Sequence, residues 1–226
     1  MRHLLAIAST LSLLAFTAYH QQIETNQITG VVQFHDCPKN IKKGTGYNKD
    51  GTEVMHSDDP MATTRLNVIL SLHPLSFTPT LTPTVDAYIT QKEQTFLPHV
   101  LPVTVGSKIH FLNEDEFFHN VQSFTSKARF SIGRRAPGIA YSKKIKKTGV
   151  INLMCDIHSH MNAIILSLDT PYFTRIAEDG SYSIGNLPDG TYRLEIFHPN
   201  CAKITDEVSL KGGQIVTLDY NFLVKP

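Results

Sequence analysis

The side chains best suited to chemistry lie close together: a thiol, an imidazole and a thioether, at Cys155, His158 and Met161. Thiolate and thioether are soft ligands that suit copper, and two imidazoles with one thiolate and a weak axial Met describe an electron-transfer site. The second imidazole must come from elsewhere in the chain, and His119, 36 positions before Cys155, can supply it. We therefore predict one copper ion held by His119, Cys155, His158 and Met161.

The spacing of the three clustered ligands constrains the backbone that holds them. Two residues separate Cys155 from His158, and two separate His158 from Met161. All three side chains can face one metal ion only from a tight loop between two strands. His119 must then lie in a neighbouring loop or strand end.

Each of these donors also has an ordinary structural interpretation. Cys155 can be an inert buried thiol, His119 a strand-end histidine and Met161 a core filler. Multicopper oxidases need several His-x-His pairs, and a binuclear copper centre needs a second nearby Cys; the chain has one such pair and no such Cys. The residues therefore favour a one-electron carrier over a copper enzyme.

The motif Cys-x-x-His-x-x-Met with an upstream His-Asn-Val resembles the ligand pattern of amicyanin-type cupredoxins, which are relatives of plastocyanin and azurin. The sequence from about Gln91 to Phe197 is also similar to exported methylamine-utilization or plastocyanin-like proteins. The other stretches with this likeness are Gln94-Thr95-Phe96-Leu97-Pro98-His99-Val100-Leu101-Pro102-Val103, Phe111-Leu112-Asn113 and Asp169-Thr170-Pro171-Tyr172-Phe173.

The resemblance implies a cupredoxin-type Greek-key β-sandwich with one mononuclear type 1 (blue) copper. It also implies that the backbone N–H of Asn120 donates a hydrogen bond to the Cys155 sulfur, which would orient and tune the site. His158 is preferred to His160 as the second imidazole because it has the amicyanin-type spacing. The implied function is outer-sphere transfer of single electrons between redox partners through the edge of His158, with no substrate turned over. The ligands would be two ring nitrogens, one thiolate and an axial thioether, from His119, His158, Cys155 and Met161.

The composition and the first residues of the chain indicate an exported protein. The chain has 226 residues, is 41% hydrophobic and has a net charge of +1, which argues against disorder and against a basic nucleic-acid-binding protein. Arg2 and His3 precede an apolar run over residues 4–18, about the length of a signal-peptide core and short for a membrane span. We predict a signal peptide over residues 1–20, a periplasmic or secreted location and no membrane span after its removal. An uncleaved anchor or a buried segment is the alternative.

Three cysteines in an exported chain leave one without a disulfide partner. If Cys155 holds the metal, Cys37 and Cys201 can form a disulfide in an oxidising compartment. Two free, buried thiols are the alternative.

Short apolar segments separated by turn residues run through the sequence, and none has a long apolar face of helical period, so we predict an all-β fold. Residues 21–169 are assigned to the cupredoxin domain, with a long polar loop over 36–65, and residues 170–226 to a small β module. The segment Ile28–Phe34 looks like the opening of such a module, so the copper-binding domain can be inserted within the module or packed against it. The module resembles the carboxypeptidase-regulatory-like or transthyretin-like β-sandwich through Asp179-Gly180-Ser181-Tyr182 and Leu187-Pro188-Asp189-Gly190-Thr191-Tyr192.

Between residues 121 and 150 the chain has eight Lys or Arg and no acidic residue. Such a cluster can steer an acidic redox partner, and a solvated hairpin is the ordinary alternative. Two functions of other classes also stay open: copper binding or delivery without redox cycling, and metal-free adhesion or scaffolding. The candidates for the docking patch are Arg134, Arg135, Lys143, Lys144, Lys146 and Lys147.

Overall fold

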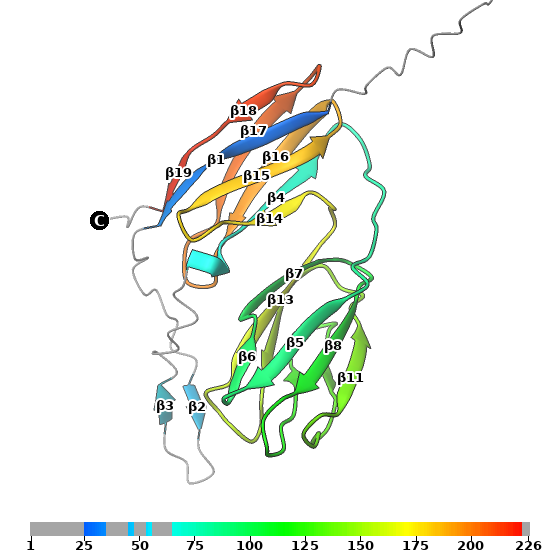
Figure 1. Cartoon of the computed structure of the whole chain (residues 1–226), viewed down its shortest axis with the longest axis vertical. Coiled ribbons are helices and arrows are strands. Elements are labelled where there is room, and N and C mark those ends of the chain that lie inside the picture. The colour runs from blue at the N-terminus through cyan, green and yellow to red at the C-terminus, as the bar shows by residue number, and fades with distance from the viewer. Residues whose placement is uncertain (1–24, 35–44, 48–52, 56–64, 223–226) are drawn as a thin grey trace, which may run out of the picture.

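The computed structural model describes residues 25–34, 45–47, 53–55 and 65–222, and Figure 1 shows two β-sandwiches arranged end to end along the long axis. The prediction of an all-β fold is confirmed: across the described residues the helical structure is one turn of 3-10 helix, η2 (Arg65–Asn67), and the other elements are strands. The predicted signal peptide, residues 1–20, lies outside the described part of the chain. Within that part, no helix is long and apolar enough to cross a membrane.

The sandwich that contains the predicted ligands is made of two sheets, with strand orders β11-β8-β5-β6 and β10-β9-β12-β13-β7. Strand β5 runs parallel to β8, and β13 runs parallel to β7. The first sheet consists of β5 (Ala87–Lys92), β6 (Thr95–Leu97), β8 (Lys108–Asn113) and β11 (Ala140–Lys144). The second consists of β7 (Val100–Thr104), β9 (Gln122–Ser123), β10 (Phe130–Ser131), β12 (Gly149–Met154) and β13 (Asn162–Leu168).

Alternating side chains from both sheets form the core of this sandwich. Strand β8 buries Ile109 and Phe111, and β12 buries Ile151 and Leu153, as the period of two in a strand requires. Full burial of each such side chain stabilises the fold by about 1.5–3 kcal/mol. Cys155 lies in this core cluster together with Met161. The predicted ligand loop is therefore anchored in the core at one end of the sandwich.

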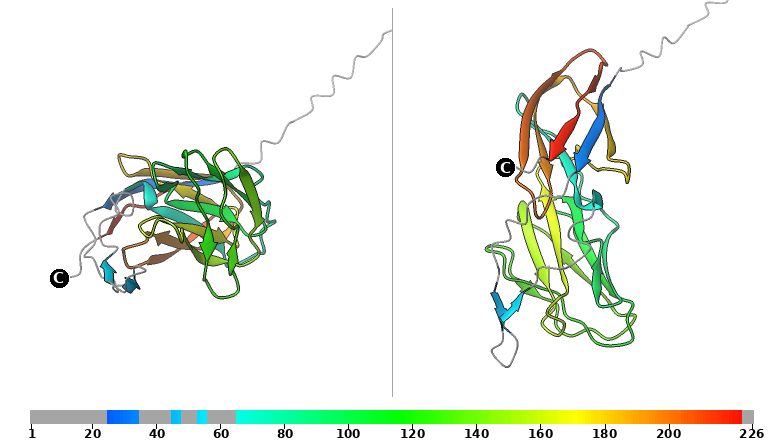
Figure 2. Two further views of the ribbon diagram at one scale, coloured as in Figure 1. Left: turned by 90° about the horizontal axis from the view of Figure 1, so that it is seen from below. Right: turned by 90° about the vertical axis from the view of Figure 1, so that its left-hand side faces the viewer.

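The second sandwich combines strands from both ends of the described chain. Its sheets have the orders β15-β1-β18, with β19 also paired to β1, and β14-β4-β16-β17, and Figure 2 shows blue β1 beside the red strands near the C-terminus. The strands are β1 (Asn26–Phe34), β4 (Ile69–Pro74), β14 (Phe173–Arg175), β15 (Ser181–Leu187), β16 (Gly190–Phe197), β17 (Ile204–Leu210), β18 (Ile215–Thr217) and β19 (Tyr220–Phe222).

The sheets thus do not follow a division after residue 169. Strands β1 and β4, which the predicted boundaries assign to the domain 21–169, hydrogen-bond to β15, β16, β18 and β19. The reason is core formation: the buried side chains of β1 and β4 pack against those of β15 and β16 in one cluster. This pairing is the one expected if the ligand-bearing sandwich is inserted between β4 and β14.

A small apolar cluster and several polar contacts join the two sandwiches. Ile69 of β4 packs against Val100 of β7 and Leu168 of β13. Arg175 donates hydrogen bonds to the backbone carbonyls of Leu66 and Val100. Residues that belong to different sandwiches are thereby held together on the side away from the predicted ligand loop.

Polar side chains extend the junction. The buried Thr170 hydroxyl donates to the carbonyl of Leu72 at 2.6 Å. His73 Nδ1 lies 2.8 Å from Asp169 Oδ1, and Ser71 Oγ lies 3.0 Å from His73 Nε2. The bonds from Thr170 and Asp169 join β4 to the segment that directly follows β13, and the contact with Ser71 holds the ring of His73 within β4.

One local prediction needs correction. Within the expected polar loop 36–65, the strands β2 (Thr45–Tyr47) and β3 (Glu53–Met55) form an antiparallel pair; the other residues of that range, apart from Arg65, lie outside the described ones. Strand β4 begins at Ile69 and not earlier. The reason is that Val68 N–H bonds to the Arg65 carbonyl, which closes the 3-10 turn η2.

Candidate metal centre

Residues 155–161 form the loop between β12 and β13, because β12 ends at Met154 and β13 begins at Asn162. Short backbone hydrogen bonds close this loop: Cys155 N–H donates to the Met161 carbonyl at 3.2 Å, and Met161 N–H donates to the His158 carbonyl at 3.0 Å. The tight loop that the motif spacing requires is therefore present.

His119 reaches the loop from the segment between β8 and β9. It pairs with Arg135 in an isolated antiparallel β-bridge, with backbone hydrogen bonds of 3.2 and 2.7 Å. Asn113, at the end of β8 and fully buried, donates through its side chain to the carbonyls of Phe117 and Arg135 at 2.7 and 3.0 Å. These bonds fix the turn that leads into His119.

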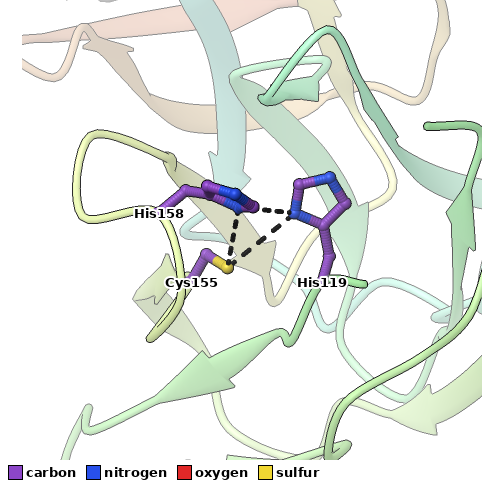
Figure 3. Close-up of side chains that lie close together, drawn as sticks. All are labelled: His119, Cys155 and His158. Carbon is purple, nitrogen blue, oxygen red and sulfur yellow. Dashed lines mark hydrogen bonds between the residues drawn. The ribbon is translucent and has the colours of Figure 1, made fainter. Parts of the chain in front are cut away.

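Three predicted ligand atoms converge at this end of the sandwich (Figure 3). The Cys155 sulfur lies 3.9 Å from His119 Nδ1 and 4.0 Å from His158 Nδ1, and the two imidazole nitrogens are 3.0 Å apart. Donors bound at about 2.0–2.3 Å to one ion stand roughly 3–4 Å from one another. The three residues form the group of His, Cys, Asp or Glu side chains in the described chain that could hold a metal ion.

The remaining predicted residues are placed as follows. Met161 is buried in the same core cluster as Cys155, and its role as an axial ligand stays a prediction. Asn120 is buried and accepts a hydrogen bond from Ser131 Oγ at 3.2 Å; the contact of its backbone N–H with the sulfur also stays a prediction. His160 is exposed, with its ring 6.3 Å from that of His158.

Asp115 is the residue at this site that the sequence analysis missed. Its Oδ2 lies 2.7 Å from His119 Nε2, while the side chains are 9% and 0% exposed. A carboxylate only accepts hydrogen bonds, so this contact requires a proton on His119 Nε2, and Nδ1 is the ring nitrogen that faces Cys155 and His158. The signal available in the sequence was an acidic residue four positions before the first candidate histidine.

The pKa values at the site favour groups that are ready to bind a cation. Burial raises the pKa of Asp115, but hydrogen bonds from the backbone of Gln94, the ring of His119 and the backbone of Glu93 outweigh it, so the net pKa lies below the ordinary value. Burial, followed by the nearby charges of His119 and His160, lowers the pKa of His158. The imidazole of His158 is therefore held in the neutral form that metals require.

An aromatic side chain covers the two histidines. The ring of Phe117 meets those of His119 and His158 edge to face, with centroids 5.1 and 5.4 Å apart. Outside it lies a hollow of about 390 Å³, lined by Phe117, Phe118, Arg134, Ile157 and His158. His119 and Cys155 are thus shut off from water, whereas His158 borders an open, largely apolar surface.

The six cations of the expected docking patch do not gather around this hollow. Arg134 lines it, whereas the guanidinium of Arg135 stacks over the ring of Tyr141 at 4.9 Å. Strand β11 starts beside the end of β8, which borders the site, and runs away from it, so that Lys144 pairs with Lys108 at the start of β8. Lys143 and Lys144 therefore lie on a strand that leads from the site toward the junction, and Lys146 and Lys147 come after its end.

The predicted disulfide involves a residue outside the described part of the chain. Cys155 is free and buried, and Cys201 is disulfide-bonded. Because Cys37 is not among the described residues, its pairing with Cys201 stays a prediction.

Several solved structures are similar to part of this chain at low sequence identity. No family model and no curated protein matches the chain. Among solved structures, the purple cupredoxin from Nitrosopumilus maritimus is 20% identical with a TM-score of 0.34 and covers 37% of this chain and 100% of its own. Amicyanin from Paracoccus versutus is 14% identical with a TM-score of 0.34 and covers 41% and 96%. The copper-containing nitrite reductase from Thermus scotoductus SA-01 is 22% identical with a TM-score of 0.36 and covers 42% and 25%.

Proposed function

We propose that this chain is an exported copper protein that passes single electrons between larger redox partners. The observation that supports the proposal most directly is the convergence of one thiolate and two imidazoles, with donor atoms 3.0 to 4.0 Å apart, on a loop anchored in the core. This donor set is the one that describes electron-transfer copper sites when a weak axial Met is added. His119, Cys155 and His158 would hold the ion, with Met161 as the axial ligand.

Copper bound there would supply a one-electron couple. The protein's part is to keep the ligands in place and to exclude water. Asp115 fixes the ring of His119, the hydrogen bonds within the loop fix Cys155, and the rigid surroundings limit movement of the ligands when an electron arrives. The partly exposed ring of His158 is the route by which an electron would leave.

The hollow beside His158 is the surface on which we propose that a redox partner docks. Phe117, Phe118 and Ile157 give it an apolar floor that is 37–55% exposed, and Arg134 adds one positive charge at its edge. The lysines of β11 lie farther away and would act through the long-range field that guides encounter with an acidic partner. Contact at the hollow and steering by the lysines would thus be separate functions, and Arg134 would contribute to both.

The absorption spectrum after addition of Cu(II) to the metal-free protein tests the proposal. We expect one equivalent of copper to bind, to give an intense visible band from thiolate-to-copper charge transfer, and to be bleached reversibly by ascorbate. Retained but colourless copper would favour binding or delivery without redox cycling, and no stoichiometric binding would favour a metal-free β-sandwich.

Single substitutions test the ligand assignment. Cys155→Ser should abolish the band. His158→Ala and His160→Ala are a matched pair, three and five residues after Cys155: the first should change or remove the band, and the second should leave it. A band that survives Cys155→Ser, or that responds only to His160→Ala, contradicts the assignment.

A further inference from the structure

The carboxylate of Asp115 joins two separate parts of the sandwich at the candidate site. Its Oδ1 accepts a hydrogen bond from the backbone N–H of Glu93 at 2.6 Å, and its Oδ2 accepts one from the N–H of Gln94 at 3.0 Å. The same Oδ2 is 2.7 Å from His119 Nε2. Three N–H donors therefore converge on two oxygens of one largely buried side chain.

Glu93 and Gln94 form the two-residue turn between β5 and β6. Their φ angles are +52° and +55°, which makes the turn one of the hairpin types that Asn and Gly usually occupy. Glu and Gln are unfavourable there because a side chain crowds the backbone in the left-handed region. Hydrogen bonds from both turn amides to Asp115 offset this cost. The turn and the carboxylate thus hold each other in place.

The position of Asp115 itself is also fixed from the other side. Its backbone N–H donates to Asn113 Oδ1 at 3.0 Å, and Asn113 is fully buried. Because Asn113 also holds the carbonyls of Phe117 and Arg135, the carboxylate has little freedom to move. Asp115 therefore acts as a rigid acceptor for the ring of His119.

We propose that Asp115 is a positioning residue of the metal centre. It sets the tautomer of His119, and its negative charge beside the site favours the more highly charged oxidation state of the metal. The β5–β6 turn, which contains no metal ligand, becomes part of the site through this carboxylate. This inference rests on the proposed function for its redox part, whereas the tautomer of His119 is a property of the metal-free protein.

Asp115→Asn removes the negative charge of the side chain but keeps its shape. Asn has one acceptor oxygen where Asp has two, so at least one of the three converging N–H groups loses its partner, and the negative charge disappears. Loss of an outer hydrogen-bond partner of a ligating His costs 10- to 100-fold in metal affinity in typical sites. We expect Cu(II) affinity to fall more than Cu(I) affinity, by about tenfold, which corresponds to a rise of about 59 mV in the one-electron reduction potential.

The matched control is Glu116→Gln, which removes one negative charge from the next residue, an exposed one. Potentials of the wild type and of both variants are measured by redox titration of the visible band. The potential should rise in Asp115→Asn and stay near the wild-type value in Glu116→Gln. Equal potentials in the wild type and Asp115→Asn, or equal rises in both variants, would overturn the redox part of the inference.

Nitrogen-15 NMR of the metal-free protein gives a second readout that needs no copper. His119 should be an Nε2–H tautomer in the wild type and a mixture of tautomers in Asp115→Asn; an Nδ1–H tautomer in the wild type overturns the inference. A wild type without the charge-transfer band refutes the proposed function but leaves this measurement intact. If Asp115→Asn does not fold, copper affinity is measured in Asp115→Glu instead, because this variant keeps the negative charge but displaces the hydrogen bonds. Unchanged copper affinity in Asp115→Glu refutes the positioning role.

Discussion

Replacement of Met161 distinguishes a metal ligand from a core residue. Met161 is 1% exposed and packs in the core cluster that also contains Cys155. Truncation of such a buried Met to Ala costs about 2–5 kcal/mol because it leaves a cavity. Exchange for Leu keeps the volume and costs less than about 1.5 kcal/mol. Leu, however, has no sulfur to offer a metal ion.

The stability of the metal-free protein gives the size of the core effect. In a chain of this length, 1 kcal/mol corresponds to about 2–4 °C in Tm. Met161→Ala should therefore lower the Tm by about 4–20 °C, and Met161→Leu by less than about 6 °C, as followed by circular dichroism without copper.

The copper spectrum then reports the ligand effect separately. If Met161 is the axial ligand, Met161→Leu should alter the position and intensity of the charge-transfer band although the fold is nearly as stable as in the wild type. A Met161→Leu protein with the wild-type spectrum would refute the axial assignment and leave Met161 as a core residue only.

Three further predictions concern the junction, acid stability and charge steering. Thr170→Val should lower the free energy of unfolding by about 1–3 kcal/mol in a denaturant titration, because the buried carbonyl of Leu72 loses its donor; an unchanged midpoint would contradict this. Burial raises the pKa of Glu195, but the hydrogen bond from Lys203 and nearby cations outweigh it, and the net pKa lies below the usual 4.5. Its stabilisation is thus present above about pH 4.5 and lost as the pH falls through the lowered pKa, so Glu195→Gln should flatten the acid limb of stability against pH; an unchanged acid limb would count against it. Arg134→Glu should slow reduction of the copper protein by hexacyanoferrate(II) up to about tenfold at low salt and more than Lys147→Glu does; the reverse order would show that the distant lysines dominate.

The ligand loop could be predicted from the sequence because its donors are nearly contiguous. Cys155, His158 and Met161 lie within seven residues, and the loop between β12 and β13 is too short to separate them. The presence of strands such as β8 and β12 was also predictable, because the alternation of buried and exposed residues is a local pattern. These features depend on neighbours in the chain.

The features that sequence analysis missed or left open depend on contacts between distant segments. Strand β1 pairs with β15, at least 150 residues away, and the partners of Asp115 lie 21 and 22 residues before it in a turn of another strand pair. The six cations are clustered in the sequence but separated in the fold: Arg134 lines the hollow, whereas Lys143 and Lys144 lie on β11, which runs away from the site. Their role in steering a partner stays a prediction. Residues that are close in the sequence are therefore reliably close in space only when they lie within a single loop.

The placement of the candidate site follows from the direction of β13. This strand begins at Asn162, next to the ligand loop, and ends at Leu168, which packs in the junction cluster. Seven residues of strand span roughly 20 Å, beyond the range of about 7–10 Å within which substitutions usually interact. The second sandwich therefore lies at the opposite end from the candidate site, and the effects of Thr170→Val and Met161→Leu on stability should add. A double variant whose loss of stability departs from the sum by more than about 0.5 kcal/mol would show that β13 couples the junction to the site.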